Sequence, residues 1–163
     1  MAEKQTVERA RRAKRTGKRP TTQAGEFVRE EIEHIRRGKH GARSTKQAIA
    51  IGLSKARRAG VKLGPPPKGR AKAKTRKSAQ YALRRAGRGG KPSRTRSRAI
   101  ESALRREGRR AASREALAAQ ARQAARRRGT AARKAAAHKA VATKGPAVRK
   151  AAARKAAATR AAA

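Results

Sequence analysis

Histidine and glutamate are the side chains of this chain that could transfer protons or ligate a metal ion. The sequence holds nine acidic residues, all glutamate, no cysteine, and three histidines, His34, His40 and His138. No histidine has a carboxylate at a spacing typical of a metal site or a catalytic triad, and arginines flank the glutamates of residues 26–33. We therefore predict no catalytic residue, no metal and no cofactor. These glutamates read as a solvated helix face, and His40 as an exposed loop residue or a phosphate contact.

Phosphate binding is a second chemistry for which suitable residues lie around position 44. Ser44 and Gln47 fit a capping box, in which Ser or Thr is followed three residues later by Glu or Gln at the start of a helix. The amides at such a helix start attract anions. We call this predicted anion site the phosphate seat. Neighbouring polar and basic residues that would add to it are Lys39, Arg43, Thr45 and Lys46. The alternative interpretation is an ordinary solvated cap.

Residues 21–63 contain the helices that would position this seat. Val28, Ile32 and Ile35 recur at the spacing of one helix face, which predicts a helix over about 22–37 that ends before Gly38. A second helix is predicted over about 45–59, with an apolar face lined by Ile49, Leu53 and Ala56 and widened by Ala48 and Ile51. We expect the two to form an antiparallel hairpin in which a glycine allows close approach, with Val61 and Leu63 folding back. The predicted hairpin core is Phe27, Val28, Ile32, Ile35, Ile49, Gly52 and Leu53.

The rest of the chain is too basic and too poor in bulky apolar residues to predict a second core. There are 49 Lys and Arg against nine acidic residues, for a net charge of +40. Leu, Ile, Val and Phe together number 16, and nine of these lie in residues 21–63. High charge with so few such residues is typical of disorder. We therefore predict a mostly α-helical protein without a β-sheet, with largely disordered, helix-prone basic arms.

Three basic zones flank the hairpin in this prediction. Residues 1–20 form an N-terminal arm. Residues 64–129 are interrupted by Pro and Gly and carry a weak repeat, in which residues 82–88 match residues 103–109. We predict that each repeat unit is a short helix that ends in two arginines and a glycine. Residues 130–163 form an Ala/Lys/Arg tail, broken by Gly145 and Pro146, with a basic residue at close to every fifth position.

This charge distribution predicts binding to double-stranded DNA with little sequence preference, by neutralisation of phosphates. Only two aromatic residues, Phe27 and Tyr81, are present, whereas single-strand binders stack bases on aromatic platforms. RNA binding and a protein partner at the Glu-rich first helix are the alternatives. We expect no membrane partner, no small-molecule substrate, no signal peptide and a cytoplasmic location. The predicted nucleic-acid contacts are Arg11, Arg12, Arg15, Lys39, Arg43, Ser44, Thr45, Lys46, Arg57, Arg58, Arg84, Arg85, Arg105, Arg106, Arg126, Arg127, Arg128, Lys134, Lys139, Lys144, Lys150 and Lys155.

Two parts of the chain resemble known proteins. Residues 21–63, TTQAGEFVREEIEHIRRGKHGARSTKQAIAIGLSKARRAGVKL, resemble a family of small basic bacterial proteins of unknown function that are sometimes labelled DNA-binding. The resemblance runs on through residues 64–129 and implies a bacterial source but no catalytic residues. Together with the predicted DNA binding, which rests on the charge, a bacterial source leads us to expect a location at the nucleoid. The tail resembles the basic tails of linker histones and of bacterial histone-like proteins, which implies a histone-like mode of binding.

Overall fold

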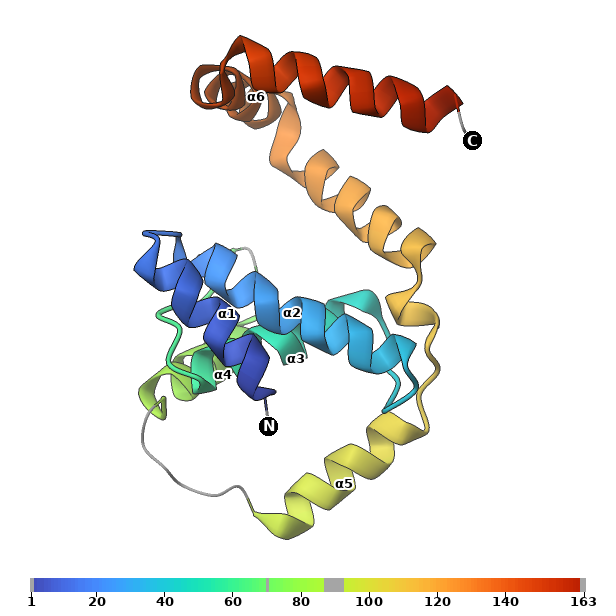
Figure 1. The fold of residues 1–163 in the computed structure, drawn as a ribbon. Coiled ribbons are helices and arrows are strands. Elements are labelled where there is room, and N and C mark those ends of the chain that lie inside the picture. The colour runs from blue at the N-terminus through green and yellow to red at the C-terminus, as the bar shows by residue number, and fades with distance from the viewer. Residues whose placement is uncertain (1, 70, 87–92, 162–163) are drawn as a thin grey trace. The chain divides into compact units, whose positions relative to one another are not determined.

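Figure 1 shows a computed structural model of the chain, which describes residues 2–69, 71–86 and 93–161. Within these ranges the chain forms six α-helices, one short 3-10 helix and no β-strand, which confirms the predicted mostly α-helical fold. None of the helices in these ranges combines the length and the apolar character that a membrane crossing requires. The chain divides into two compact units, Met1–Ala118 and Ala119–Ala163.

The predicted hairpin is formed by α2, Pro20–Arg36, and α3, Thr45–Arg58. Helix α2 begins earlier than expected, because Pro20 occupies its first turn, where proline suits the helix since no backbone N–H is needed there. It ends before Gly38, whose φ of 75° lies in the left-handed region that favours glycine. The capping box at the start of α3 is present in part: Ser44 Oγ accepts from Gln47 N at 3.2 Å, as expected, while the Gln47 side chain accepts from Arg43 N rather than from Ser44 N.

Small residues form the face of α3 that contacts α2. Ala48, Gly52 and Ala56 are buried, whereas Ile49 and Leu53, predicted to line this face, are only partly buried at its edges. A Cβ atom at Gly52 would lie 2.7 Å from the Cα atom of Val28, so the two helix backbones nearly touch. The expected close approach at Gly52 is confirmed. The face of α3 that contacts α2 is therefore centred on the small residues and not on Ile49 and Leu53, because larger side chains would hold the two helices apart.

The remaining predicted core residues lie in two apolar clusters that flank the crossing of α2 and α3. Ile32 and Ile35 pack with Ala48, with partly buried Val28 beside them. Phe27, which is fully buried, packs with Ala56. Val61 is buried in the second cluster and Leu63 packs against it, as predicted for the chain after α3.

The N-terminal arm is a helix, so its predicted disorder is wrong. Helix α1, Lys4–Arg15, packs on α2. Ala10 is buried in the cluster that contains Phe27, and Arg9 Nε donates to Glu26 Oε2 at 3.0 Å. A glutamate of α2 thus provides a counter-charge to the basic helix, which lets its small apolar face reach the core.

The segment that follows α5, Arg94–Arg105, returns to the loop between α2 and α3. Gly41 N donates to Leu104 O at 2.9 Å, and Ala42 N donates to Gly108 O at 3.1 Å. The two backbones cross so closely that a Cβ atom at Gly41 would overlap Glu107 O. The 3-10 helix η1, Arg110–Ala112, then buries Ala111 and Ala112 against the hairpin core. The core therefore extends beyond residues 21–63.

The predicted short helices of residues 64–129 are present. Helix α4, Ala73–Arg84, packs on α3 through a face that buries Ala79 and Ala82, whereas α5 buries no residue. Both helices end at the first of two consecutive arginines, as the repeat predicted. The end of the first repeat unit, Gly87 and Arg88, lies outside the described residues.

The tail is helical as well. Helix α6, Arg114–Ala161, has non-helical backbone at Gly129 (φ 76°, ψ 169°) and at Gly145 (φ 65°, ψ 167°). Both breaks were predicted, the one at Gly145 and Pro146 within the tail and the one at Gly129 as the glycine that closes residues 64–129. The predicted disorder is wrong because alanine, arginine and lysine have high helix propensities even where no core is available. The two glycines divide α6 into the segments 114–128, 130–144 and 146–161.

Candidate nucleic-acid interface

Nearly all of the predicted phosphate contacts are exposed. They are carried by α1, by the ends of α3, α4 and α5, by the loop before α3 and by α6. In the tail, successive cations are about five residues apart, and each step of that length turns a helix by about 140°. Within each segment of α6, the exposed charges therefore point in several directions around the axis instead of forming one stripe.

Thr45 and Arg57 are the two exceptions, because both are buried. The Thr45 hydroxyl donates to Ala111 O at 2.7 Å. Arg57 donates from Nε to Leu63 O at 3.0 Å and from Nη2 to Gly64 O at 3.1 Å, and burial lowers the pKa of its guanidinium. Both polar groups are used inside the fold, which corrects their assignment as phosphate contacts.

The predicted phosphate seat at the start of α3 has internal partners for much of its polar surface. Ser44 Oγ accepts from Gln47 N, which is one of the amides that an anion would otherwise bind. Arg43 Nε donates to Glu107 Oε1 at 3.2 Å, and Lys39 Nζ donates to Glu3 Oε1 at 3.1 Å. The contact of Ser44 with Gln47 is that of an ordinary helix cap, and the two ion pairs occupy cations that an anion would otherwise bind.

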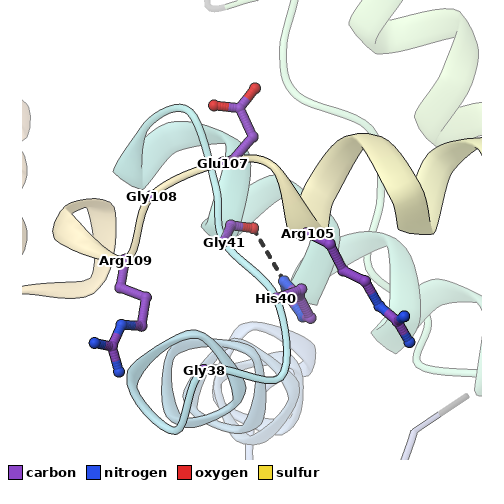
Figure 2. A pocket seen from close by; sticks show the side chains of 7 residues that line it. All are labelled: Gly38, His40, Gly41, Arg105, Glu107, Gly108 and Arg109. Atoms are coloured by element: carbon purple, nitrogen blue, oxygen red, sulfur yellow. Dashed lines mark hydrogen bonds between the residues drawn. The ribbon is translucent and has the colours of Figure 1, made fainter.

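A shallow hollow of about 400 Å³ lies between the loop after α2 and the segment after α5 (Figure 2). Arg105 and Arg109 extend on either side of it, while Glu107 points away and pairs with Arg43. The two guanidinium groups give this hollow donors that suit an anion. His40 does not add one, because its Nδ1 lies 3.0 Å from Gly41 O and its Nε2 lies 3.3 Å from Glu31 Oε1. Arg109 was not among the predicted contacts. The lining residues are Gly38, His40, Gly41, Arg105, Glu107, Gly108 and Arg109.

The glutamates of α2 are not a uniformly solvated face. Glu30 and Glu31 are buried, and Lys55 Nζ of α3 lies 3.4 Å from Glu30 Oε1 and 2.6 Å from Glu31 Oε2. Glu3 N also donates to Glu30 Oε2 at 3.1 Å. The predicted solvated face is therefore wrong for these two residues, because α1 and α3 cover them and supply their partners.

Two histidines contact carboxylates, which corrects the prediction that none does. His34 Nε2 lies 2.8 Å from Glu3 Oε1, and His40 Nε2 lies 3.3 Å from Glu31 Oε1. The sequence contains one signal for this group that the prediction overlooked: Glu31 and His34 are three residues apart and so share a helix face. The approach of Glu3 and His40 depends on the packing of α1 and on the path of the loop, which no local pattern reveals.

Glu3 gives this cluster a pH dependence that can be measured. The hydrogen bond from His34, followed by that from Lys39, lowers the pKa of Glu3 from 4.5 to about 2. A carboxyl whose pKa is lowered in the folded state stabilises the fold above its unfolded pKa, and this contribution is lost as the pH falls through the folded pKa. Glu3→Gln is therefore expected to be less stable than the wild type above pH 4.5, and the difference is expected to shrink as the pH falls toward 2.

Urea unfolding followed by circular dichroism across this pH range measures the difference. Glu101→Gln is the control, because Glu101 is an exposed residue of α5 that pairs with Arg105 within its own helix. A stability difference between Glu3→Gln and the wild type that stays constant down to the lowest pH would contradict the assignment.

Comparison with known proteins adds a family match and no function. No curated protein and no solved structure is significantly similar to this chain. The family match covers α1, α2 and α3, and so includes the N-terminal helix that was predicted to be a disordered arm. Unlike the predicted resemblance, it does not continue through residues 71–129. Residues 4–70 match the model of a family that is described as "Family of unknown function (DUF6496)".

Proposed function

We propose that the protein binds double-stranded DNA through its phosphates, with little sequence preference, as a nucleoid-associated protein of bacteria. The observation that carries the proposal is the net charge of +40, borne largely by exposed arginine and lysine side chains. Self-repulsion of such a charge opposes a compact state unless a polyanion neutralises it. Each phosphate that a cation neutralises releases counterions, which supplies the free energy of binding.

The form of the tail favours a duplex partner over a single strand. Its cations surround α6, so they can contact phosphates from several directions at once. Of the two aromatic residues, Phe27 is buried, which leaves Tyr81 as the exposed ring. One exposed ring does not provide a stacking platform for successive unpaired bases.

The alternative of a protein partner on the glutamates of α2 has less support. Glu26, Glu30 and Glu31 all contact basic side chains of this same chain. A basic partner would have to displace those internal ion pairs. RNA remains the direct rival of DNA, because its phosphates offer the same chemistry.

The test is the salt dependence of binding to duplexes of random sequence, measured by fluorescence anisotropy. The slope of log K against log salt is about −0.9 per phosphate contact on duplex DNA. A full-length variant that carries Lys139→Gln, Lys144→Gln, Lys150→Gln and Lys155→Gln is expected to reduce this slope by up to about 3 to 4. The same four positions changed to arginine are the matched control, and the slope is expected to stay near that of the wild type.

Two results would contradict this function. The first is wild-type affinity that does not change between about 50 and 200 mM salt, since even six phosphate contacts imply a loss of about 10³-fold over that range. The second is a complex from cells that is lost on treatment with RNase and survives DNase, which would assign the charge to RNA instead.

A further inference from the structure

Glu31, His34 and His40 form a group whose ligand atoms all lie within 4.8 Å of one another. Glu31 and His34 are one turn apart on α2, and His40 lies in the loop that follows. Glu31 is fully buried, and its Oε2 pairs with Lys55 Nζ at 2.6 Å, whereas its Oε1 has no hydrogen-bond partner among the described groups. A buried carboxylate oxygen without a hydrogen bond is costly, so Oε1 is the atom that has room for a further ligand.

The spacing of two of these atoms fits a transition metal. His40 Nε2 lies 3.3 Å from Glu31 Oε1. Zinc bonds of about 2.0–2.1 Å in tetrahedral geometry place neighbouring ligand atoms about 3.3–3.4 Å apart. A small cation can therefore bind both atoms without a large movement of either side chain.

The groups behind the two imidazoles also fit a metal site. His40 Nδ1 lies 3.0 Å from Gly41 O, a contact that Figure 2 shows, and His34 Nε2 lies 2.8 Å from Glu3 Oε1. A histidine that ligates a metal almost always donates its other ring N–H to a carbonyl or a carboxylate. These contacts leave His40 Nε2 and His34 Nδ1 as the nitrogens that can ligate a metal.

The charges around the group favour a cation over an anion. Glu3, Glu30 and Glu31 bring three carboxylates, and Lys39 and Lys55 bring two ammonium groups. The three carboxylates exceed the two ammonium groups by one negative charge. Lys55 lies beside Oε2 of Glu31, which leaves Oε1 for a metal.

We propose that Glu31, His34 and His40 bind one divalent transition-metal ion, with zinc as the best fit. Two imidazoles and a carboxylate suit zinc, and in a tetrahedral ion they leave the fourth position for water or an exogenous ligand. The metal would fasten the loop after α2 to the helix, and with it the segment after α5 that crosses this loop. The inference does not depend on the proposed function, because it concerns the folded hairpin and not the basic surface.

The test uses the full-length protein, freed of metal by a chelator and without nucleic acid. Zinc is titrated in competition with a chromophoric chelator, and cobalt(II) is titrated while its visible absorption is recorded. The wild type is expected to bind one zinc ion per chain, to show the intense bands of tetrahedral cobalt and to melt at a higher temperature with zinc. His34→Ala and His40→Ala are each expected to weaken zinc binding by about 100-fold or more.

His138→Ala is the matched control, because it removes a histidine from the tail and should bind zinc like the wild type. Circular dichroism of each variant without metal shows whether its helices are intact. The cobalt spectrum of the wild type tests the site without any substitution. Absence of zinc binding by the wild type, weak octahedral cobalt bands, or an equal loss in His138→Ala and His40→Ala would each overturn the proposal.

Discussion

Replacing Phe27 with alanine is expected to lower the free energy of unfolding by about 3–5 kcal/mol. Phe27 is fully buried and has the largest volume of the fully buried side chains in the described residues. Its buried neighbours, Ala10, Ala24 and Ala56 among them, are too short to fill the space that the ring would leave. Urea unfolding of the full-length chain, followed by circular dichroism, measures the loss.

Phe27→Leu separates the effect of the cavity from a general intolerance of change at this position. Leucine retains much of the apolar volume, so the variant is expected to lose less than about 2 kcal/mol. An alanine variant that unfolds within about 0.5 kcal/mol of the wild type would mean that the cluster around Phe27 is not the core of the hairpin.

The second large effect is expected at the crossing of α2 and α3. Gly52→Ala would place a Cβ atom 2.7 Å from Val28 Cα and 3.0 Å from Phe27 O. Both neighbours are backbone atoms, so the overlap can be relieved only by moving one helix away from the other. We expect this substitution to destabilise the fold by about 1–3 kcal/mol, although alanine is the better helix former.

Gly25 provides a matched control within the same hairpin. It lies inside α2, and a Cβ atom there would have no neighbour within 4 Å. Gly25→Ala is therefore expected to stabilise the protein by up to about 1 kcal/mol through helix propensity alone. The prediction is that the two glycine substitutions have opposite signs in the same unfolding assay, and a stabilising Gly52→Ala would refute the close crossing.

The hairpin was predictable because its signals are local. The recurrence of Val28, Ile32 and Ile35, the cap at Ser44 and the glycine at position 38 each act within one or two turns of helix. The contact face of α3 was predicted in part: Ala48, Gly52 and Ala56 were expected on it and are buried, whereas Ile49 and Leu53, favoured by their apolar character, are only partly buried. Size, and not apolar character, decides which side of α3 can reach the backbone of α2.

Structure that depends on distant residues was missed. Helix α1 is held by contacts to α2 such as that of Arg9 with Glu26, and the segment around Ala111 is held by Thr45, 66 residues earlier in the chain. The composition indicates that the cations of these basic segments repel one another. It gives no sign of the acidic side chains that offset this repulsion in the folded chain. The approach of His40 to Glu31 was hidden for the same reason.

The two left-handed glycines of α6 set the mechanical character of the tail. An unbroken helix of this length would be a rod of about 72 Å, stiff along its whole length. Gly129 and Gly145 divide it into three rods of about 22–24 Å, each shorter than one turn of a DNA duplex. Three short helical segments that meet at glycines can each align with a different part of a curved polyanion, which a single straight helix cannot do.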